Sequence, residues 1–184
     1  MSTEDLSFQI RPATLKDAPA LAKLAESTFR ATFAVYNTDS DMALHCQRSY
    51  GPAIQSGEIA NPQMHTLVCE AEHQLIGYAQ LRFGPAPDCV MARSPTSKPA
   101  EIQRLYVADS WHGKGVAPAL MGACLQEMEK RHLDTVWLGV WEHNPRALRF
   151  YQKTGFVAVG DHIFPVGNDP QRDVLMMRPL EHNG

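Results

Sequence analysis

The stretch EIQRLYVADSWHGKGVAPAL, residues 101–120, decides the fold of this chain. It begins with a strand pattern over Ile102–Val107, passes through a turn with two glycines, and enters an amphipathic helix predicted from Val116 to about His132. The segment Val136–Trp141 that follows is apolar on both faces, as a strand in the middle of a sheet is. Because one helix connects these two strands, we expect them to be adjacent, parallel and central.

The turn between the first strand and the helix is the sharpest chemical feature of the sequence. Its residues are His112, Gly113, Lys114, Gly115, Val116 and Ala117. Glycines let backbone amides approach a ligand, and the start of a helix offers free N–H groups and a positive dipole end, so this turn can hold a phosphate. It does not match the Walker loop, because both the upstream glycine and the final Ser or Thr of that pattern are missing. It does not match the dinucleotide fingerprint, because Pro118 stands where that pattern has its third glycine. A plain glycine turn before a core helix is the alternative.

A second feature follows the buried strand, where residues 144–151 read NPRALRFY and lead to Gly155-Phe156. Asn144 and Pro145 are typical of an N-cap and a first helical position, so Asn144 could serve the helix alone. Tyr151 falls on the apolar face of the predicted helix Pro145–Thr154. Taken alone, it fits a core aromatic with a hydrogen-bonded hydroxyl better than a catalytic acid.

The flanking sequence predicts further elements around this βαβα unit. They are a strand at Phe8–Arg11, a long helix that follows the cap Thr14 and runs to Phe33, a helix at Asp39–Ser49, a hairpin of His65–Glu70 with Leu75–Phe83, a loop over 84–99, and strands near Phe156–Val159 and Val174–Met177. We expect one domain over residues 1–184, with polar ends at about 1–5 and 181–184.

The order of the two features, a strand, a Gly-Lys-Gly turn, a helix, a strand, then Asn-x(6)-Tyr and Gly-Phe, resembles the GNAT superfamily of acyl-CoA-dependent N-acetyltransferases. The resemblance implies an α/β (α+β) fold. Its sheet would be mixed, twisted and mostly antiparallel, with a central parallel strand pair and helices on both faces. Residues 29–37, followed by Asp39 and Asp41, are also similar to the early helices of a polyamine- or amino-acid-acetylating branch.

The resemblance also implies roles for particular residues. The amides of His112, Gly113, Lys114, Gly115, Val116 and Ala117 would hold the pyrophosphate of coenzyme A, with His112 where relatives carry Gln or Arg. Leu105, Tyr106 and Val107 would present backbone groups to the pantetheine arm, and Asn144 would contact that arm or a water. Tyr151 would protonate the leaving thiolate. Glu101 would act as a general base through water, or be an exposed strand-end carboxylate.

Composition narrows the classes of partner. Seventeen basic and twenty acidic side chains give a net charge of −3, whereas a protein that binds nucleic acid normally carries a basic excess. No apolar run is long enough to span a membrane, and the acidic start of the chain is not a secretory signal. The four cysteines form no Cys-x-x-Cys pair and the eight histidines are scattered, so we expect reduced thiols, no metal site and a cytoplasmic protein.

The sequence therefore predicts an enzyme that transfers an acetyl group from acetyl-CoA directly to a primary amine, most simply that of a small molecule. Two alternatives stay open: an acetyltransferase acting on a protein N-terminus or lysine, and a non-catalytic acyl-CoA-binding sensor domain. Retention of Tyr151 favours an enzyme, because binding alone needs no acid for the thiolate. The sequence leaves open whether the protein is a monomer or a homodimer.

Overall fold

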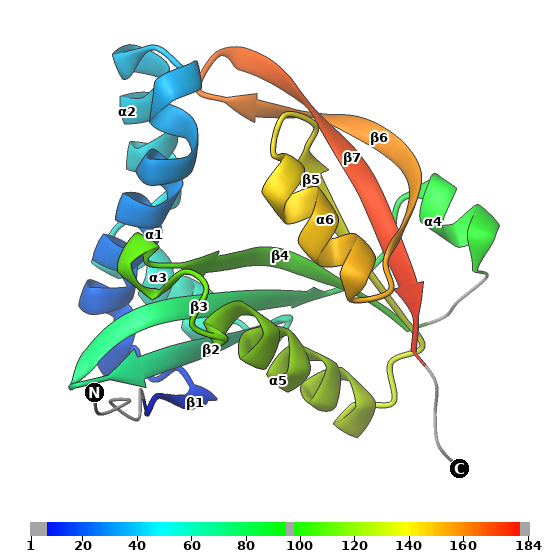
Figure 1. Ribbon diagram of the computed structural model, residues 1–184, viewed down its shortest axis with the longest axis horizontal. Coiled ribbons are helices and arrows are strands. Elements are labelled where there is room, and N and C mark those ends of the chain that lie inside the picture. Colours follow the sequence, from blue (N-terminus) through cyan, green and yellow to red (C-terminus); the bar gives the residue numbers. More distant parts are fainter. Residues whose placement is uncertain (1–6, 95–97, 181–184) are drawn as a thin grey trace, which may run out of the picture.

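The structure is a computed structural model that describes residues 7–94 and 98–180. Within them, seven strands form one twisted sheet in the order β1-β2-β3-β4-β5-β7-β6 (Figure 1). The strands are β1 (Gln9–Pro12), β2 (Met64–Ala71), β3 (Gln74–Phe83), β4 (Pro99–Val107), β5 (Thr135–Trp141), β6 (Val157–Val166) and β7 (Asp169–Pro179). The predicted parallel pair is confirmed, because β4 and β5 are parallel neighbours at the centre and the other described pairs are antiparallel.

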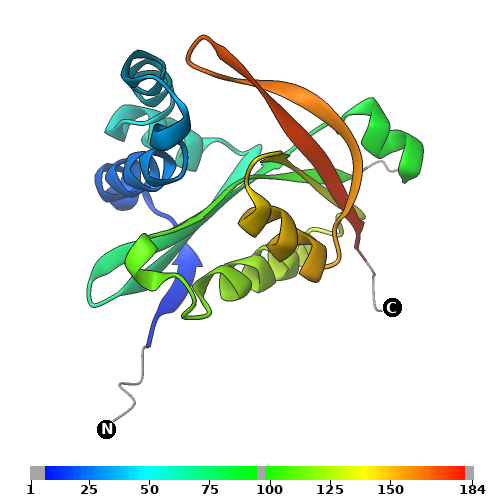
Figure 2. The ribbon, with the colours of Figure 1, turned by 45° about the horizontal axis from the view of Figure 1, so that its top comes forward.

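Helices cover both faces of this sheet (Figures 1 and 2). They are α1 (Ala18–Phe33), α2 (Asp39–Ser49), α3 (Pro52–Ala60), α4 (Asp88–Arg93), α5 (Val116–Lys130) and α6 (Pro145–Lys153). The side chains of α5 and α6 pack into the larger apolar core with one face of the sheet. Those of α1 and α2 pack into a second core on the opposite face, and α4 adds a small third cluster. The mixed α/β fold predicted from the sequence is thereby confirmed.

The first long helix forms where its cap and its apolar stripe predict it. The backbone N–H of Thr14 donates to the Asp17 carboxylate at 2.7 Å, which completes a capping box at the short 3-10 turn before α1. Leu21, Ala25 and Phe29 then follow at helical spacing and are at most 3% exposed. The helix therefore presents one apolar face to the sheet and supplies Phe29 and Phe33 to the core above β4.

The central parallel pair separates soon after it forms. Its ladder has three register pairs, Pro99 with Thr135, Ala100 with Val136, and Glu101 with Trp137. Beyond them β4 and β5 diverge, as Figure 1 shows. On its other edge, where β4 pairs with β3, β4 carries a bulge. Gln80 pairs with Arg104 and the next residue, Leu81, pairs with Ile102, so Gln103 has no register partner. A bulge increases local twist, so it turns β4 away from β5.

Three elements differ from the sequence prediction. Helix α3 was not predicted; Pro52 occupies its first turn, and the Gly51 N–H before it is capped by the Gln55 side chain at 2.8 Å. Residues 84–99, predicted as a loop, contain the short helix α4, whose Val90 is fully buried. The last two strands are longer than predicted and form a hairpin of 157–179. Of the rest, residues 95–97 and the polar ends at about 1–5 and 181–184 lie outside the described residues.

The β6–β7 hairpin reaches across to α2 (Figure 1). At its tip, the Asn168 N–H donates to the Asp41 carboxylate at 2.9 Å, and on β7 the Gln171 amide donates to the Asn37 side chain at 2.7 Å. The hairpin and the early helices thus enclose the space above the diverging strands. Among the described helices, none has both the length and the apolar character needed to cross a membrane.

Leu120 tests the core that positions α5. Its side chain is fully buried and lies against Gly77 of β3. We expect Leu120→Ala to lower the free energy of unfolding by about 2–5 kcal/mol, because the substitution removes buried methyl groups and leaves a cavity. Urea denaturation measures this, and Leu15→Ala is the control because Leu15 is 59% exposed. An equal loss in both variants would contradict this account of the core.

Candidate active site

A cavity of about 290 Å³ passes through the sheet where β4 and β5 diverge. We call it the through-sheet cavity. The diverging strands line it with Ile102–Tyr106 and Gly139–Trp141; α6 and the residue that caps it contribute Asn144, Ala147 and Tyr151; and the opposite face contributes Phe29, Phe33, His45, Ser49, Tyr50, Phe164, Gln171 and Asp173. Tyr151 belongs to the core below the sheet, whereas Phe29 and Phe33 belong to the core above it. A ligand threaded between the strands would touch groups on both faces.

Tyr151 lies on the α6 side of this cavity. Its ring packs edge-on against Phe150 and Phe156, at centroid distances of 5.3 and 5.8 Å, so its orientation is fixed by packing. Burial first, and then Tyr106 and Cys124, raise the pKa of the Tyr151 phenol well above its ordinary value. The hydroxyl therefore keeps its proton at neutral pH and can donate it.

Asn144 performs the capping role that its sequence predicts. Its side-chain oxygen accepts the Ala147 N–H at 3.1 Å, and Pro145 follows at the first helical position. Asn144 also lines the through-sheet cavity. Leu105 and Tyr106 line it as well, while the side chain of Val107 is directed into the core below the sheet.

The glycine turn has the backbone conformation that a phosphate cradle needs. Gly113 and Gly115 have φ of 74° and 82°, the left-handed region that favours glycine, and no atom lies within 4 Å of where their Cβ would be. Helix α5 begins directly after Gly115, and an early helical bond runs from the Ala119 N–H to the Gly115 carbonyl. The amides of Val116 and Ala117 precede that bond, so they are free to meet an anion.

His112 links three elements at this turn. Its Nε2 lies 2.8 Å from the Val107 carbonyl oxygen, which can only accept, so Nε2 carries the proton. Its Nδ1 then accepts a hydrogen bond from the Arg146 guanidinium at 2.8 Å. Histidine here fixes the turn to the end of β4 and holds the cation of Arg146, on α6, beside the cradle. The sequence analysis missed Arg146, although its place in the first turn of α6 was visible.

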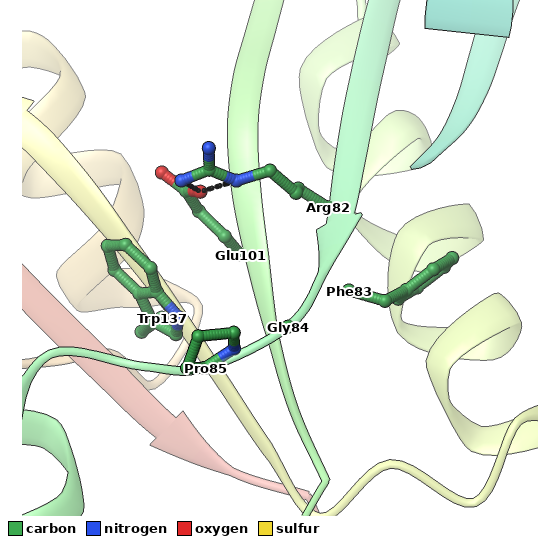
Figure 3. Close-up of a pocket in the computed structure, with 6 residues that line it drawn as sticks. All are labelled: Arg82, Phe83, Gly84, Pro85, Glu101 and Trp137. Atoms are coloured by element: carbon green, nitrogen blue, oxygen red, sulfur yellow. Dashed lines mark hydrogen bonds and ion pairs between the residues drawn. The ribbon is translucent and has the colours of Figure 1, made fainter. Parts of the chain in front are cut away.

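Glu101 lies at the last position at which β4 pairs with β5. It is beside a separate pocket of about 240 Å³ (Figure 3). One of its oxygens accepts from Arg82 Nε at 2.8 Å and lies 2.6 Å from a second guanidinium nitrogen. Burial raises the pKa of Glu101 and the Arg82 charge opposes that shift. Among the described residues, Glu101 is not one of those that line the through-sheet cavity.

The cavity wall above the sheet is largely aromatic. The ring of Phe29 stacks on that of His45, with centroids 4.1 Å apart, and packs at a tilt against Phe33 at 4.4 Å. Trp141 contacts Phe33 with ring centroids 5.4 Å apart. Burial, and next the nearby Arg104, lower the pKa of His45 to about 4, so it is neutral at pH 7. Asp173, on β7, adds a carboxylate to this wall, which also contains the polar side chains of Ser49 and Gln171 and the guanidinium of Arg104, paired with Glu58 at 3.0 Å.

Asp173 and its neighbour His162 were missed by the sequence analysis. They lie opposite each other on β7 and β6, in a hairpin whose length was underestimated. Asp173 stands just before the apolar run Val174–Met177, and this position at the start of a predicted strand was the sequence feature that could have indicated it as a site residue.

A central parallel pair that opens into a cavity, with a glycine turn at the start of the next helix, defines a class of α/β proteins that take a phosphate-bearing ligand between two strands of the sheet. The family model for the GNAT acetyltransferase family matches residues 21–156. The chain therefore belongs to that family, and it is an acetyltransferase.

Curated relatives and solved structures agree with this assignment. The chain is 30% identical over 166 residues to an uncharacterized N-acetyltransferase of Mycobacterium tuberculosis, a match that covers 90% of this chain and 99% of the relative. It is 28% identical over 165 residues to one from Lactobacillus delbrueckii subsp. lactis, with coverage of 90% and 93%.

The fold resembles that of the PaiA N-acetyltransferase from Thermoplasma acidophilum, solved in complex with coenzyme A. The TM-score is 0.74 at 21% identity, over 94% of this chain and 99% of that one. It also resembles the ribosomal-protein-S18-alanine N-acetyltransferase of Escherichia coli, with a TM-score of 0.68 at 16% identity and 97% of both chains covered.

Proposed function

We propose that this protein transfers an acetyl group from acetyl-CoA directly to the primary amine of a small molecule. The observation that carries the proposal is the through-sheet cavity, which has a buried phenol at one side of the sheet and an aromatic wall with a carboxylate at the other. A donor and an acceptor can approach from opposite faces and meet between β4 and β5. Acetyl-CoA is the donor that coenzyme A-dependent members of this family use.

On the donor side, the amides of residues 113–117 hold the pyrophosphate and Arg146 adds a positive charge beside it. The pantetheine arm lies along β4, where the backbone groups of Leu105 and Tyr106 face the opening left by β5. An amide-bearing chain can pair with such an open strand edge as a further strand would. His112 and Asn144 hold the two helix starts that border this path.

The chemistry at the meeting point needs a neutral amine. An alkylamine with a pKa of about 10.4 is neutral in only about one molecule in a few thousand at pH 7, a deficit of roughly 4–5 kcal/mol. Positioning the amine beside the thioester and removing its proton offset this deficit. The amine attacks the thioester carbonyl directly, and Tyr151 donates its proton to the departing thiolate. Glu101 as the base that acts through water stays a prediction.

The size of the cavity supports a small acceptor. The contacts of the β6–β7 hairpin with Asp41 and Asn37 enclose the space above the strands, and a cavity of about 290 Å³ suits a small molecule better than a folded protein segment. The aromatic wall favours an acceptor that carries its amine on an apolar body. A cytoplasmic location and the oligomeric state stay predictions.

A panel of amines tests the function. The purified protein is mixed with acetyl-CoA and with alkyl- and arylalkylamines, polyamines, amino acids or peptides, and thiol release is measured. We expect turnover with small amines and none with peptides. Turnover with peptides alone would assign a protein acetyltransferase, and tight acetyl-CoA binding without turnover would assign a sensor domain.

Gly115→Asp tests the donor cradle. It forces a side chain into a backbone with φ of 82° and places a carboxylate near the pyrophosphate, so we expect acetyl-CoA to bind at least about tenfold more weakly by calorimetry. Gly57→Asp is the matched control, because Gly57 is an exposed glycine in α3 with equally open surroundings. Parent-like binding by a folded Gly115→Asp protein would show that the cradle is wrongly placed.

Tyr151→Phe tests the acid. The ring and its packing stay while the proton donor is lost, so we expect kcat to fall by about 10–10⁴-fold with little change in acetyl-CoA affinity. The control is Tyr78→Phe, which removes a buried hydroxyl that has no hydrogen-bond partner among the described residues. If both variants turned over like the parent, Tyr151 would be a core aromatic only.

A further inference from the structure

An acid and a histidine face each other on the β6–β7 hairpin, on the acceptor side of the through-sheet cavity. Asp173 lines the cavity, and His162 is its register partner on β6. Their nearest oxygen and nitrogen, Oδ2 and Nε2, lie 3.6 Å apart. The side chain of Asp173 is 12% exposed and that of His162 is 39% exposed, so the pair runs from the cavity toward solvent.

Gly139 leaves the room that this pair occupies. A Cβ at Gly139 would lie 3.1 Å from His162 Nε2 and 3.2 Å from Asp173 Oδ2, closer than most side chains tolerate. Gly139 is on β5, beyond the last position at which that strand pairs with β4. The missing side chain therefore lets the carboxylate and the imidazole lie directly over β5 at Gly139, which also lines the through-sheet cavity.

The polar groups of the pair are left incompletely satisfied. His162 Nε2 is buried and has no hydrogen-bond partner among the described residues. Burial raises the pKa of Asp173, and His162 offsets only part of that shift. A buried carboxylate in an aromatic wall is stabilised by a cation that enters the cavity, and an ammonium group is such a cation.

Glu101 is a weaker candidate for this task. Both Arg82 contacts fall on one of its oxygens, and it belongs to a different pocket (Figure 3). A carboxylate held by a guanidinium is a poorer proton acceptor than one without such a partner. Asp173 has an imidazole in place of a guanidinium beside its carboxylate, and an imidazole can carry a proton on either of its two ring nitrogens.

We propose that Asp173 receives the ammonium group of the acceptor and removes its proton, with His162 passing that proton to solvent. The proposal rests on the proposed transfer to an amine. Asp173 is then a catalytic residue, and His162 is a positioning and relay residue behind it.

The step balances. One ammonium proton goes to Asp173 and leaves through His162, and the freed lone pair forms the C–N bond at the thioester carbonyl. The C–S bond breaks, and the thiolate takes the proton of Tyr151. The nitrogen loses a second proton as the amide forms, and that proton restores the phenol of Tyr151. The sum is an ammonium and a thioester giving an amide, a thiol and one proton in solution.

Few other charges face the pair. Tyr106 lies toward Asp173 from β4, and burial, more than that carboxylate, raises its pKa to about 12, so it stays neutral. Glu101, also on β4, interacts electrostatically with His162, and it is itself held by Arg82 of β3. The residues of β5 against the pair, Gly139 and Trp141, carry no charge.

The neighbouring charges on the hairpin are engaged with one another. Arg172 binds Asp161 at 2.8 Å and Glu142 at 2.9 Å. Asp161 and Arg172 are one residue from the pair in each strand, so their side chains point to the opposite face of the hairpin. Asp173 and Glu101 are therefore the two carboxylates that a pH profile of the acceptor step has to separate.

The test compares Asp173→Asn with Asp161→Asn, a carboxylate on the same hairpin outside the cavity. With the best amine of the panel, we expect Asp173→Asn to lower kcat/KM at pH 7 by about 10²–10³-fold. The loss should shrink about tenfold per pH unit as the free amine becomes abundant, because the variant depends on amine that is already neutral. Acetyl-CoA affinity should stay unchanged, and Asp161→Asn should behave like the parent.

Further variants separate catalysis from structure. His162→Gln should give a smaller loss at pH 7 that also recovers at high pH, and Asp173→Glu should restore part of the activity. Should Asp173→Asn fail to fold, His162→Gln and Asp173→Glu decide the matter by their pH profiles. A loss that is equal at every pH, or a parent-like Asp173→Asn beside a pH-dependent defect in Glu101→Gln, would overturn the proposal.

These outcomes are distinct from failure of the proposed function. If the parent acetylates peptides alone, the small-molecule function is wrong, and the same variants are compared with the peptide as acceptor. If the parent binds acetyl-CoA and releases no thiol with any amine, both the function and the role of Asp173 are wrong.

Discussion

The separation of β4 from β5 after three register pairs is the constraint on which the site depends. Two central strands that part leave backbone N–H and C=O groups without their usual partners, and buried groups of this kind need replacements. A bulge in β4 opposite Gln80 adds local twist beside the opening, and the long hairpin of β6 and β7 reaches over to α2 above it. An extended ligand with its own amides, such as pantetheine, can pair with these groups as a further strand would.

The opening also divides the chemistry between two faces. Tyr151 lies in the apolar core below the sheet, where burial keeps its phenol protonated. The aromatic wall above the sheet holds Asp173, where burial makes a carboxylate more basic. In the proposed mechanism the acid and the base are thereby on opposite faces of the sheet, so neither neutralises the other before a substrate lies between them.

The sequence predicts the central βαβα unit because its signals are local. The Gly-x-Gly turn, the apolar run Val136–Trp141 and the cap at Asn144 each act within a few residues, and the structure has all three. Helix α3 lacks such a signal, because Gly57 and Ser56 interrupt it and its one buried side chain is polar Gln55. The hairpin of β6 and β7 was underestimated for a similar reason: β6 is largely exposed, so it has no apolar alternation.

In the candidate site, too, the sequence shows the charged residues but not the partners that they meet in the fold. Glu101 was a candidate base because it lies at the start of β4. Its carboxylate is held by Arg82, which is its register partner on β3 and is distant from it in the sequence. His112 stands where relatives carry Gln or Arg, and its hydrogen bonds to the Val107 carbonyl and to Arg146 place a cation beside the glycine turn. In both cases the residue type was visible and the partner was not. The pairing of strands decides which carboxylate a guanidinium holds, so the proposal of Asp173 rather than Glu101 as the base rests on the sheet register and not on the motif.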